Sequence, residues 1–126
     1  MMPGKDPEAR IFYCPHGPTG GRQIGNDIAA SVAKGRFAYI FMDDFTAVGA
    51  VGQLRKLGID IPGQVGIIGH DNSVFSICAE PQLTTIDTNI ENMAAIMGDT
   101  LQSLFQGKTV GNKIVVSPTL IIRETT

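Results

Sequence analysis

The sequence predicts an α/β domain built as a three-layer, doubly wound and mostly parallel sheet. Two apolar runs, 37–42 and 64–69, are too short for globular helices and rich in β-forming residues, so we expect strands buried on both faces. Helical patterns alternate with these strands, which favours a parallel sheet. Both runs stop at acids, Asp43 and Asp44 after the first and Asp71 after the second. Ligands bind at this carboxyl edge of such sheets.

The composition and charge of the chain argue against several classes of function. The 126 residues suffice for one domain, and a net charge of −2 gives no sign of a nucleic-acid surface over this segment. No apolar run approaches the roughly 20 residues that span a bilayer, and the N-terminal stretch lacks a signal-peptide core. Cys14 and Cys78 fit neither a disulfide framework nor a metal motif. We expect reduced thiols in a cytoplasmic protein that does not contact a membrane.

The chain before the first long strand divides into four parts. Residues 1–9 are expected to be disordered or an artificial start, and 10–126 to form the domain. Within the domain, 10–14 is predicted as a short strand and 15–21 as a loop, because three glycines and two prolines interrupt any element. A helix over 22–34 follows. The loop lacks the spacing of a phosphate-binding P-loop, which favours a flexible connection bordering a cleft.

The remaining elements alternate regularly. After the first long strand we expect a helix ended by Gly58, the second long strand, a short helix over 73–79 and a strand over 83–86. Thr88 and Glu91 match a capping box for a helix whose methionines are interpreted as core filler. Two further strands are predicted at the end of the chain, over 113–116 and 119–122.

The acids at the strand ends are the candidate binding groups. Paired carboxylates can hold Mg²⁺, but the first lysine after them is Lys56, at the far end of the next helix, so we predict no metal site. Asp44 suits a helix N-cap, which leaves Asp43 for a ligand. Asp71 can accept hydrogen bonds from adjacent ligand hydroxyls. His70 is either a packing residue or a ligand contact, and no nucleophile–base signature predicts catalytic residues or an enzyme.

Four motifs resemble the lactose/galactose-repressor (LacI/GalR) family of bacterial transcription regulators. Residues 43–50 (Asp-Asp-Phe-Thr-Ala-Val-Gly-Ala) are similar to the family's Asn-Asp-x-x-Ala-x-Gly-Ala. Residues 57–72 are similar to Leu-Gly-x-x-Val-Pro-x-Asp-Val-Ser-Val-Val-Gly-Phe-Asp-Asp. The run 81–86 (Pro-Gln-Leu-Thr-Thr-Ile) and the ending 120–126 (Leu-Ile-Ile-Arg-Glu-Thr-Thr) complete the set.

The resemblance implies the latter part of the C-terminal subdomain of a type I periplasmic-binding-protein-like effector domain. It implies effector contacts at Asp43, Asp71 and the loop before the first helix, for which we name His16 and Thr19, with His70 as a further candidate. Asp43 replaces an amide of the family pattern and His70 an aromatic residue. An acceptor-only carboxylate favours a polyol or an amine-bearing ligand.

The expected function is sensing of a small, sugar-like effector that controls DNA binding allosterically, with no cofactor. Operator DNA is expected to be bound only through an N-terminal head with no counterpart in this stretch. Homodimerisation is expected through the helix from Thr46 and the short helix from Ser73, at Val48, Val51, Phe75 and Ile77. The alternatives are a solute-binding protein of a sugar transporter, which has the same fold, and a flavodoxin-like enzyme. The ending of the chain favours the regulator.

Overall fold

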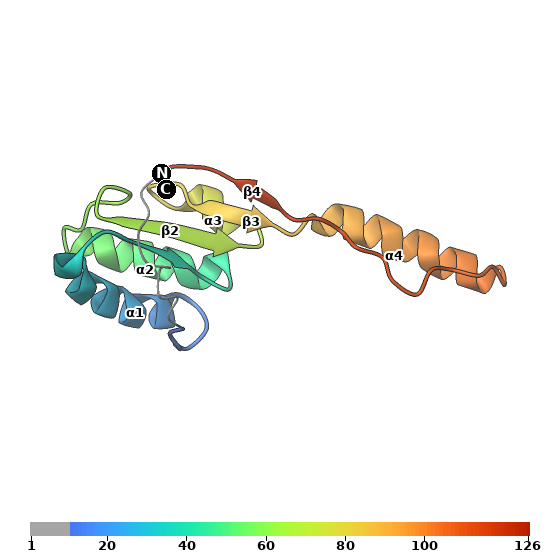
Figure 1. Ribbon diagram of the computed structural model, residues 1–126, viewed down its shortest axis with the longest axis horizontal. Coiled ribbons are helices and arrows are strands. Elements are labelled where there is room, and N and C mark those ends of the chain that lie inside the picture. Colours follow the sequence, from blue (N-terminus) through green and yellow to red (C-terminus); the bar gives the residue numbers. More distant parts are fainter. Residues whose placement is uncertain (1–10) are drawn as a thin grey trace, which may run out of the picture.

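The computed structural model describes residues 11–126 and contains one four-stranded sheet in the order β1-β2-β3-β4 (Figure 1). The predicted α/β class and mostly parallel sheet are confirmed. The predicted disorder of residues 1–9 lies outside the described residues. The elements are α1 (Pro18–Ser31), η1 (Val32–Lys34), β1 (Phe37–Ile40), α2 (Asp44–Lys56), β2 (Val65–His70), α3 (Val74–Cys78), β3 (Thr84–Asp87), α4 (Ile90–Phe105) and β4 (Thr119–Ile121).

The sheet register brings the ends of β1 and β2 to one edge. These strands are parallel neighbours, with Ile40 opposite Ile68, and the amide of Phe41 continues the ladder by donating to the Ile68 carbonyl at 2.8 Å. β3 extends the sheet in parallel and β4 pairs with it antiparallel. The expectation that both acid-bearing strand ends lie side by side is therefore confirmed.

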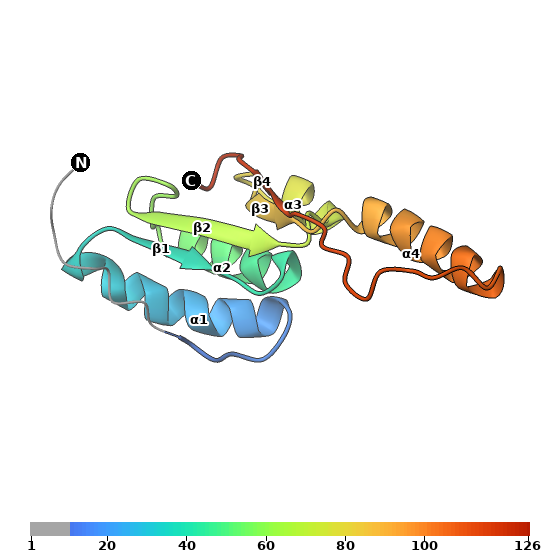
Figure 2. The ribbon, with the colours of Figure 1, turned by 45° about the vertical axis from the view of Figure 1, so that its right-hand side comes forward.

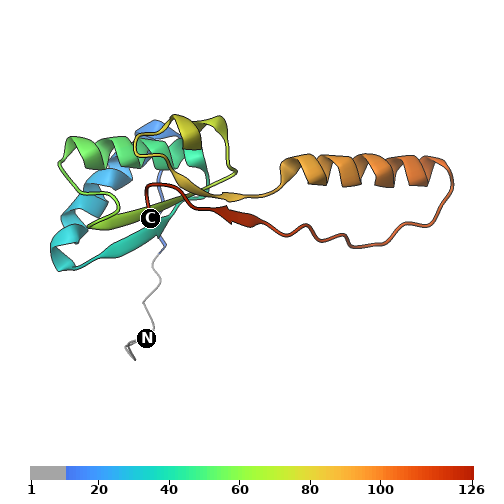
Figure 3. The ribbon, with the colours of Figure 1, turned by 90° about the horizontal axis from the view of Figure 1, so that it is seen from above.

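One face of the sheet carries the helices. Figure 3 shows α2 and α3 on the same side of β1 and β2, and α1 packs against α2. Burial along β2 alternates accordingly: Val65 and Ile67 are completely buried, while Gly66 and Ile68 are half-buried. In β1, Ile40 is exposed. The expectation of strands buried on both faces was wrong, because the described residues place no helix over the second face.

Helix α1 begins earlier than expected, inside the predicted loop 15–21. Pro18 stands in the first turn, where a missing N–H is tolerated. Gly21 continues the helix because α2 lies against it: a Cβ at Gly21 would fall on the Thr46 carbonyl oxygen, and one at Gly49 on the Pro18 carbonyl oxygen. These glycines serve close helix packing, which their loop-forming tendency in the sequence conceals.

Gly21→Ala should destabilise the protein by about 1–3 kcal/mol, since the added methyl overpacks a contact made by rigid backbone. Gly52→Ala, on an open side of α2 with no atom within 4 Å of its Cβ, should instead stabilise by up to about 1 kcal/mol through helix propensity. Urea unfolding of the two variants checks this pair. Equal behaviour of both would contradict the packing explanation.

The segment 88–118, named here the α4 arm, projects from the rest of the chain (Figures 1 and 3). Helix α4 contains no buried residue, so the interpretation of its methionines as core filler was wrong for the described chain. Its return segment lies alongside it (Figure 2), forming with it an apolar groove of about 420 Å³ lined by Met93, Met97 and Ile114 among others.

Three local predictions differ from the structure. The helix N-cap is Asn89 in the left-handed region with no side-chain cap, so the Thr88 capping box does not form. Residues 113–116 are not a strand, and neither are the described residues 11–14. Both runs are mostly exposed, and neither has a neighbouring strand among residues 11–126. A β-type sequence needs such a neighbour for its backbone hydrogen bonds. Along 11–126, no helix is long and apolar enough to cross a membrane.

The end of the chain is hydrogen-bonded to the sheet at the first residue of β3, away from the edge that carries the acids. Thr125 is completely buried, and its hydroxyl accepts from the Thr84 amide at 2.9 Å and donates to the Ile67 carbonyl at 2.6 Å. The Ile67 amide donates to the Thr125 carbonyl at 2.9 Å. The tail therefore joins β2 to β3 where their own pairing has not begun.

Candidate functional site

Asp44 joins the three segments that meet at the carboxyl edge of the sheet. Its carboxylate is 1% exposed and accepts from the Ser73 amide at 2.7 Å, the Ser73 hydroxyl at 3.0 Å and the Thr85 hydroxyl at 2.6 Å. Asp44 lies after β1, Ser73 after β2 and Thr85 in β3. Asp44 therefore connects these segments beneath the edge, and its burial keeps its carboxylate away from any ligand.

Asp43 is the N-cap of α2, the role that the sequence assigned to Asp44. Asp43 keeps an extended backbone, and its carboxylate accepts from the Thr46 amide at 2.6 Å and the Thr46 hydroxyl at 3.0 Å. The expected assignment of the two acids is thus reversed. The Asp43 side chain is still 19% exposed, and an ionised carboxylate has about four acceptor positions, so it keeps capacity for a ligand hydroxyl.

Asp71 stands in a turn at the mouth of β2 and faces solvent. Its carboxylate is 53% exposed, and within 11–126 its one hydrogen-bonding partner is the imidazole Nδ1 of His70, at 2.8 Å. The turn is unusual because Asp71 (φ 98°) and Asn72 (φ 48°) both adopt left-handed backbone, which costs free energy in non-glycine residues. This turn presents an acceptor group beyond the strand end.

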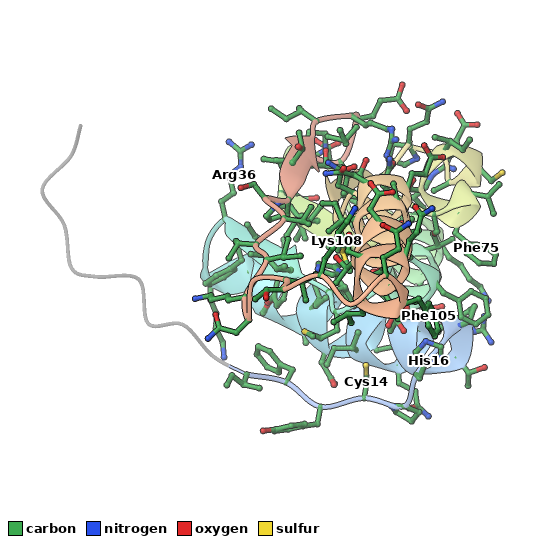
Figure 4. All side chains as sticks on the ribbon, turned by 90° about the vertical axis from the view of Figure 1, so that its right-hand side faces the viewer. Cys14, His16, Arg36, Phe75, Phe105 and Lys108 are labelled. Carbon is green, nitrogen blue, oxygen red and sulfur yellow. The ribbon has the colours of Figure 1, made fainter. Side chains whose placement is uncertain are left out.

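An aromatic row borders the Asp43 side of the edge. The His16 imidazole lies 5.7 Å from the Phe45 ring, and Phe45 lies 4.8 Å from Phe75. His16 and Phe75 occupy the same flank in Figure 4. The His16 Nε2 atom also lies 3.6 Å from the Asp43 carboxylate. Sequence reasoning missed Phe45, although an aromatic residue directly after the acid pair was a visible signal.

The structure forms two pairs from the predicted site residues, His16 with Asp43 and His70 with Asp71. Thr19 joins neither pair. It is exposed in the first turn of α1, where its hydroxyl accepts from the Arg22 guanidinium at 2.9 Å.

The predicted dimer residues divide between core and surface. Val51 is 2% exposed and belongs to the core, so it has no surface left for a partner, and Val48 packs half-buried against that core. Phe75 and Ile77 are exposed on α3. The sequence placed Val51 wrongly because α2 is covered by both the sheet and α1.

Acceptor groups and aromatic rings thus gather at the carboxyl edge of parallel strands, the edge at which open α/β sheets bind ligands. The chain belongs to the family of the periplasmic binding protein-like domain, whose model matches residues 9–126. Its curated relatives are LacI/GalR-type regulators, so the resemblance found in the motifs is confirmed.

Three matches illustrate the relationship. The chain is 36% identical over 89 residues to an HTH-type transcriptional regulator of Lachnoclostridium phytofermentans, covering 71% of this chain and 27% of the relative. It is 32% identical over 108 residues to HTH-type transcriptional regulator GalR of Escherichia coli, covering 83% and 31%. A solved periplasmic binding protein/LacI transcriptional regulator from Alkaliphilus metalliredigens, complexed with D-xylulofuranose, matches with TM-score 0.69 and 31% identity, over 82% and 38%.

The chain therefore spans about a third or less of the length of these curated relatives.

Proposed function

We propose that this chain is the effector-sensing part of a LacI/GalR-type transcription regulator. It binds a small, sugar-like ligand at the edge that carries Asp43 and Asp71, and binding alters DNA binding by the full-length protein. The observation that carries the proposal is the Asp71 carboxylate, raised on a left-handed turn beyond β2 and open to solvent. The relatives support it, since they are HTH-type regulators and one solved relative holds a sugar.

The chemistry of the edge favours a neutral or amine-bearing polyol. Two carboxylates accept hydrogen bonds from hydroxyl or ammonium groups, and charge-assisted bonds of this kind are the stronger class. The same carboxylates repel a phosphate or carboxylate ligand. His16 and Phe45 offer ring faces for the apolar side of a sugar. His70 fixes one Asp71 oxygen, which leaves the other to accept from the ligand.

The remaining parts of the proposal follow from the same assignment. The homodimer forms through the exposed Phe75 and Ile77 of α3, without Val51. Operator DNA is bound by a head outside the matched residues, the protein works in the cytoplasm, and it has no catalytic role. The regulator relatives favour this function over a solute-binding protein of a transporter.

Calorimetric titration of the full-length protein tests the proposal. The panel is D-xylulose, D-galactose, D-glucosamine and D-glucose 6-phosphate. We expect saturable binding of a neutral or amino sugar and none of the phosphate. Tightest binding of the phosphate would refute the assigned site chemistry, and a flat response to every sugar would refute the sugar class.

A further inference from the structure

A polar bridge holds the turn that carries Asp71. The Arg123 guanidinium donates through Nη2 to the Asn72 carbonyl oxygen Oδ1 at 2.7 Å. The Asn72 amide nitrogen Nδ2 donates in turn to the Asp87 carboxylate at 3.1 Å. These opposite requirements fix the orientation of the Asn72 amide, because only its oxygen accepts and only its nitrogen donates.

The two anchors of this bridge lie on the two segments that connect the α4 arm to the rest of the chain. Asp87 is the last residue of β3, just before the arm departs, and Arg123 follows β4, just after it returns. The path is visible in Figure 2. One Asn72 side chain therefore contacts the outgoing and the returning segment together.

Arg123 is itself held firmly. Its Nη1 donates to the Leu83 carbonyl at 2.8 Å and the Ser76 hydroxyl at 3.1 Å, and its own amide donates to the Thr84 hydroxyl at 2.9 Å. The half-buried guanidinium thus uses its planar fork on several neutral acceptors, a geometry that lysine does not reproduce.

The bridge bears on Asp71 through the strained backbone. Asp71 and Asn72 both have positive φ, and such residues keep that conformation only when their surroundings hold them. Two backbone N–H groups also hold the turn. The Asp71 N–H donates to the Ile86 carbonyl at 2.9 Å, and the Asn72 backbone N–H donates to the Thr85 hydroxyl at 3.2 Å. The bridge from Arg123 through Asn72 to Asp87 adds side-chain hydrogen bonds to the same turn.

We propose that Arg123 and Asn72 are positioning residues that set the direction of the Asp71 carboxylate and couple it to the α4 arm. A ligand that binds Asp71 then favours one position of the segments at Asp87 and Arg123. Because coupling is reciprocal, moving the arm to that position raises ligand affinity by the factor by which the ligand favours that position. The role in ligand binding rests on the proposed function, whereas the restraint of the turn does not.

Hydrogen exchange by mass spectrometry on the full-length protein tests the restraint without any ligand. Arg123→Met should speed exchange of the Asp71 and Asn72 amides about ten-fold, while exchange inside β2 stays unchanged. Asn72→Asp, which tolerates left-handed backbone but loses the donor to Asp87, should act in the same direction. Arg36→Met, an exposed arginine on the Pro62 carbonyl, is the matched control and should change neither region.

The coupling between Asp71 and the arm is measured by hydrogen exchange in the presence of D-xylulose or D-galactose, whichever binds more tightly. Saturation should slow exchange at residues 88–92 in the unaltered protein, and Arg123→Met should abolish that effect and weaken binding about ten-fold. A uniform rise of exchange across the sheet in Arg123→Met would reduce Arg123 to a structural role and overturn the proposal, as would unchanged exchange at the turn. Absence of sugar binding to the unaltered protein would refute the proposed function alone, since the turn measurement decides the restraint separately.

Discussion

Replacing Asp44 by asparagine should lower the free energy of unfolding by about 3 kcal/mol or more. The buried carboxylate accepts from three donors, and hydrogen bonds to a charged group contribute about 1.5–3 kcal/mol each without being additive. An amide of the same size turns its NH₂ group toward at least one of these donors. The part-buried Ser73 amide or the buried Thr85 hydroxyl then loses its partner.

The buried Asp44 side chain packs directly against β2. A Cβ at Gly69 would fall on Asp44 Oδ1, so the side chain fills the space above β2. The measurement is urea unfolding at 25 °C, with Asp99→Asn on exposed α4 as the control for the change of charge. A loss below about 1 kcal/mol for Asp44→Asn would show that the three hydrogen bonds are not a significant support of the fold.

The sheet edge that carries the candidate site could be predicted from the sequence, because it depends on strand order. Two apolar runs ending at acids suffice to place Asp43 and Asp71 at one edge. The roles of Asp43 and Asp44 could not be predicted, since they depend on which residue is the last with extended backbone before α2. One position along the chain separates the helix cap, Asp43, from Asp44, the buried carboxylate that connects the strands.

Predictions about packing failed where the partner lies far away in sequence. Gly21 suggests a loop until Thr46 is known to lie against it, and no local pattern carries that information. The periodicity of α4 predicted a helix correctly, but it reports an apolar stripe rather than what covers it. The Arg123–Asn72 bridge spans 51 positions of the chain and requires coordinates.

Asp71→Ala should weaken effector binding by roughly ten- to a hundred-fold, which corresponds to the loss of about 1.5–3 kcal/mol from hydrogen bonds to a charged acceptor. Operator affinity without effector should stay nearly unchanged, because the Asp71 carboxylate is proposed to contact the ligand and not the DNA. The competing explanation is that Asp71 ties down the turn by accepting backbone N–H groups. Within residues 11–126 its carboxylate contacts the His70 imidazole and no backbone amide, which favours the ligand role.

The backbone complicates the alanine variant, and a second variant resolves it. Alanine adopts φ near 98° less readily than aspartate does, so some loss of stability follows from the turn itself. Asp71→Asn tolerates the left-handed turn and keeps the size of the side chain, while removing the charge. It should therefore keep the melting temperature and still lose most of the sugar affinity. Calorimetric titration beside a melting curve separates the effects: unchanged affinity in both variants, with a lower melting temperature, would remove Asp71 from the binding site.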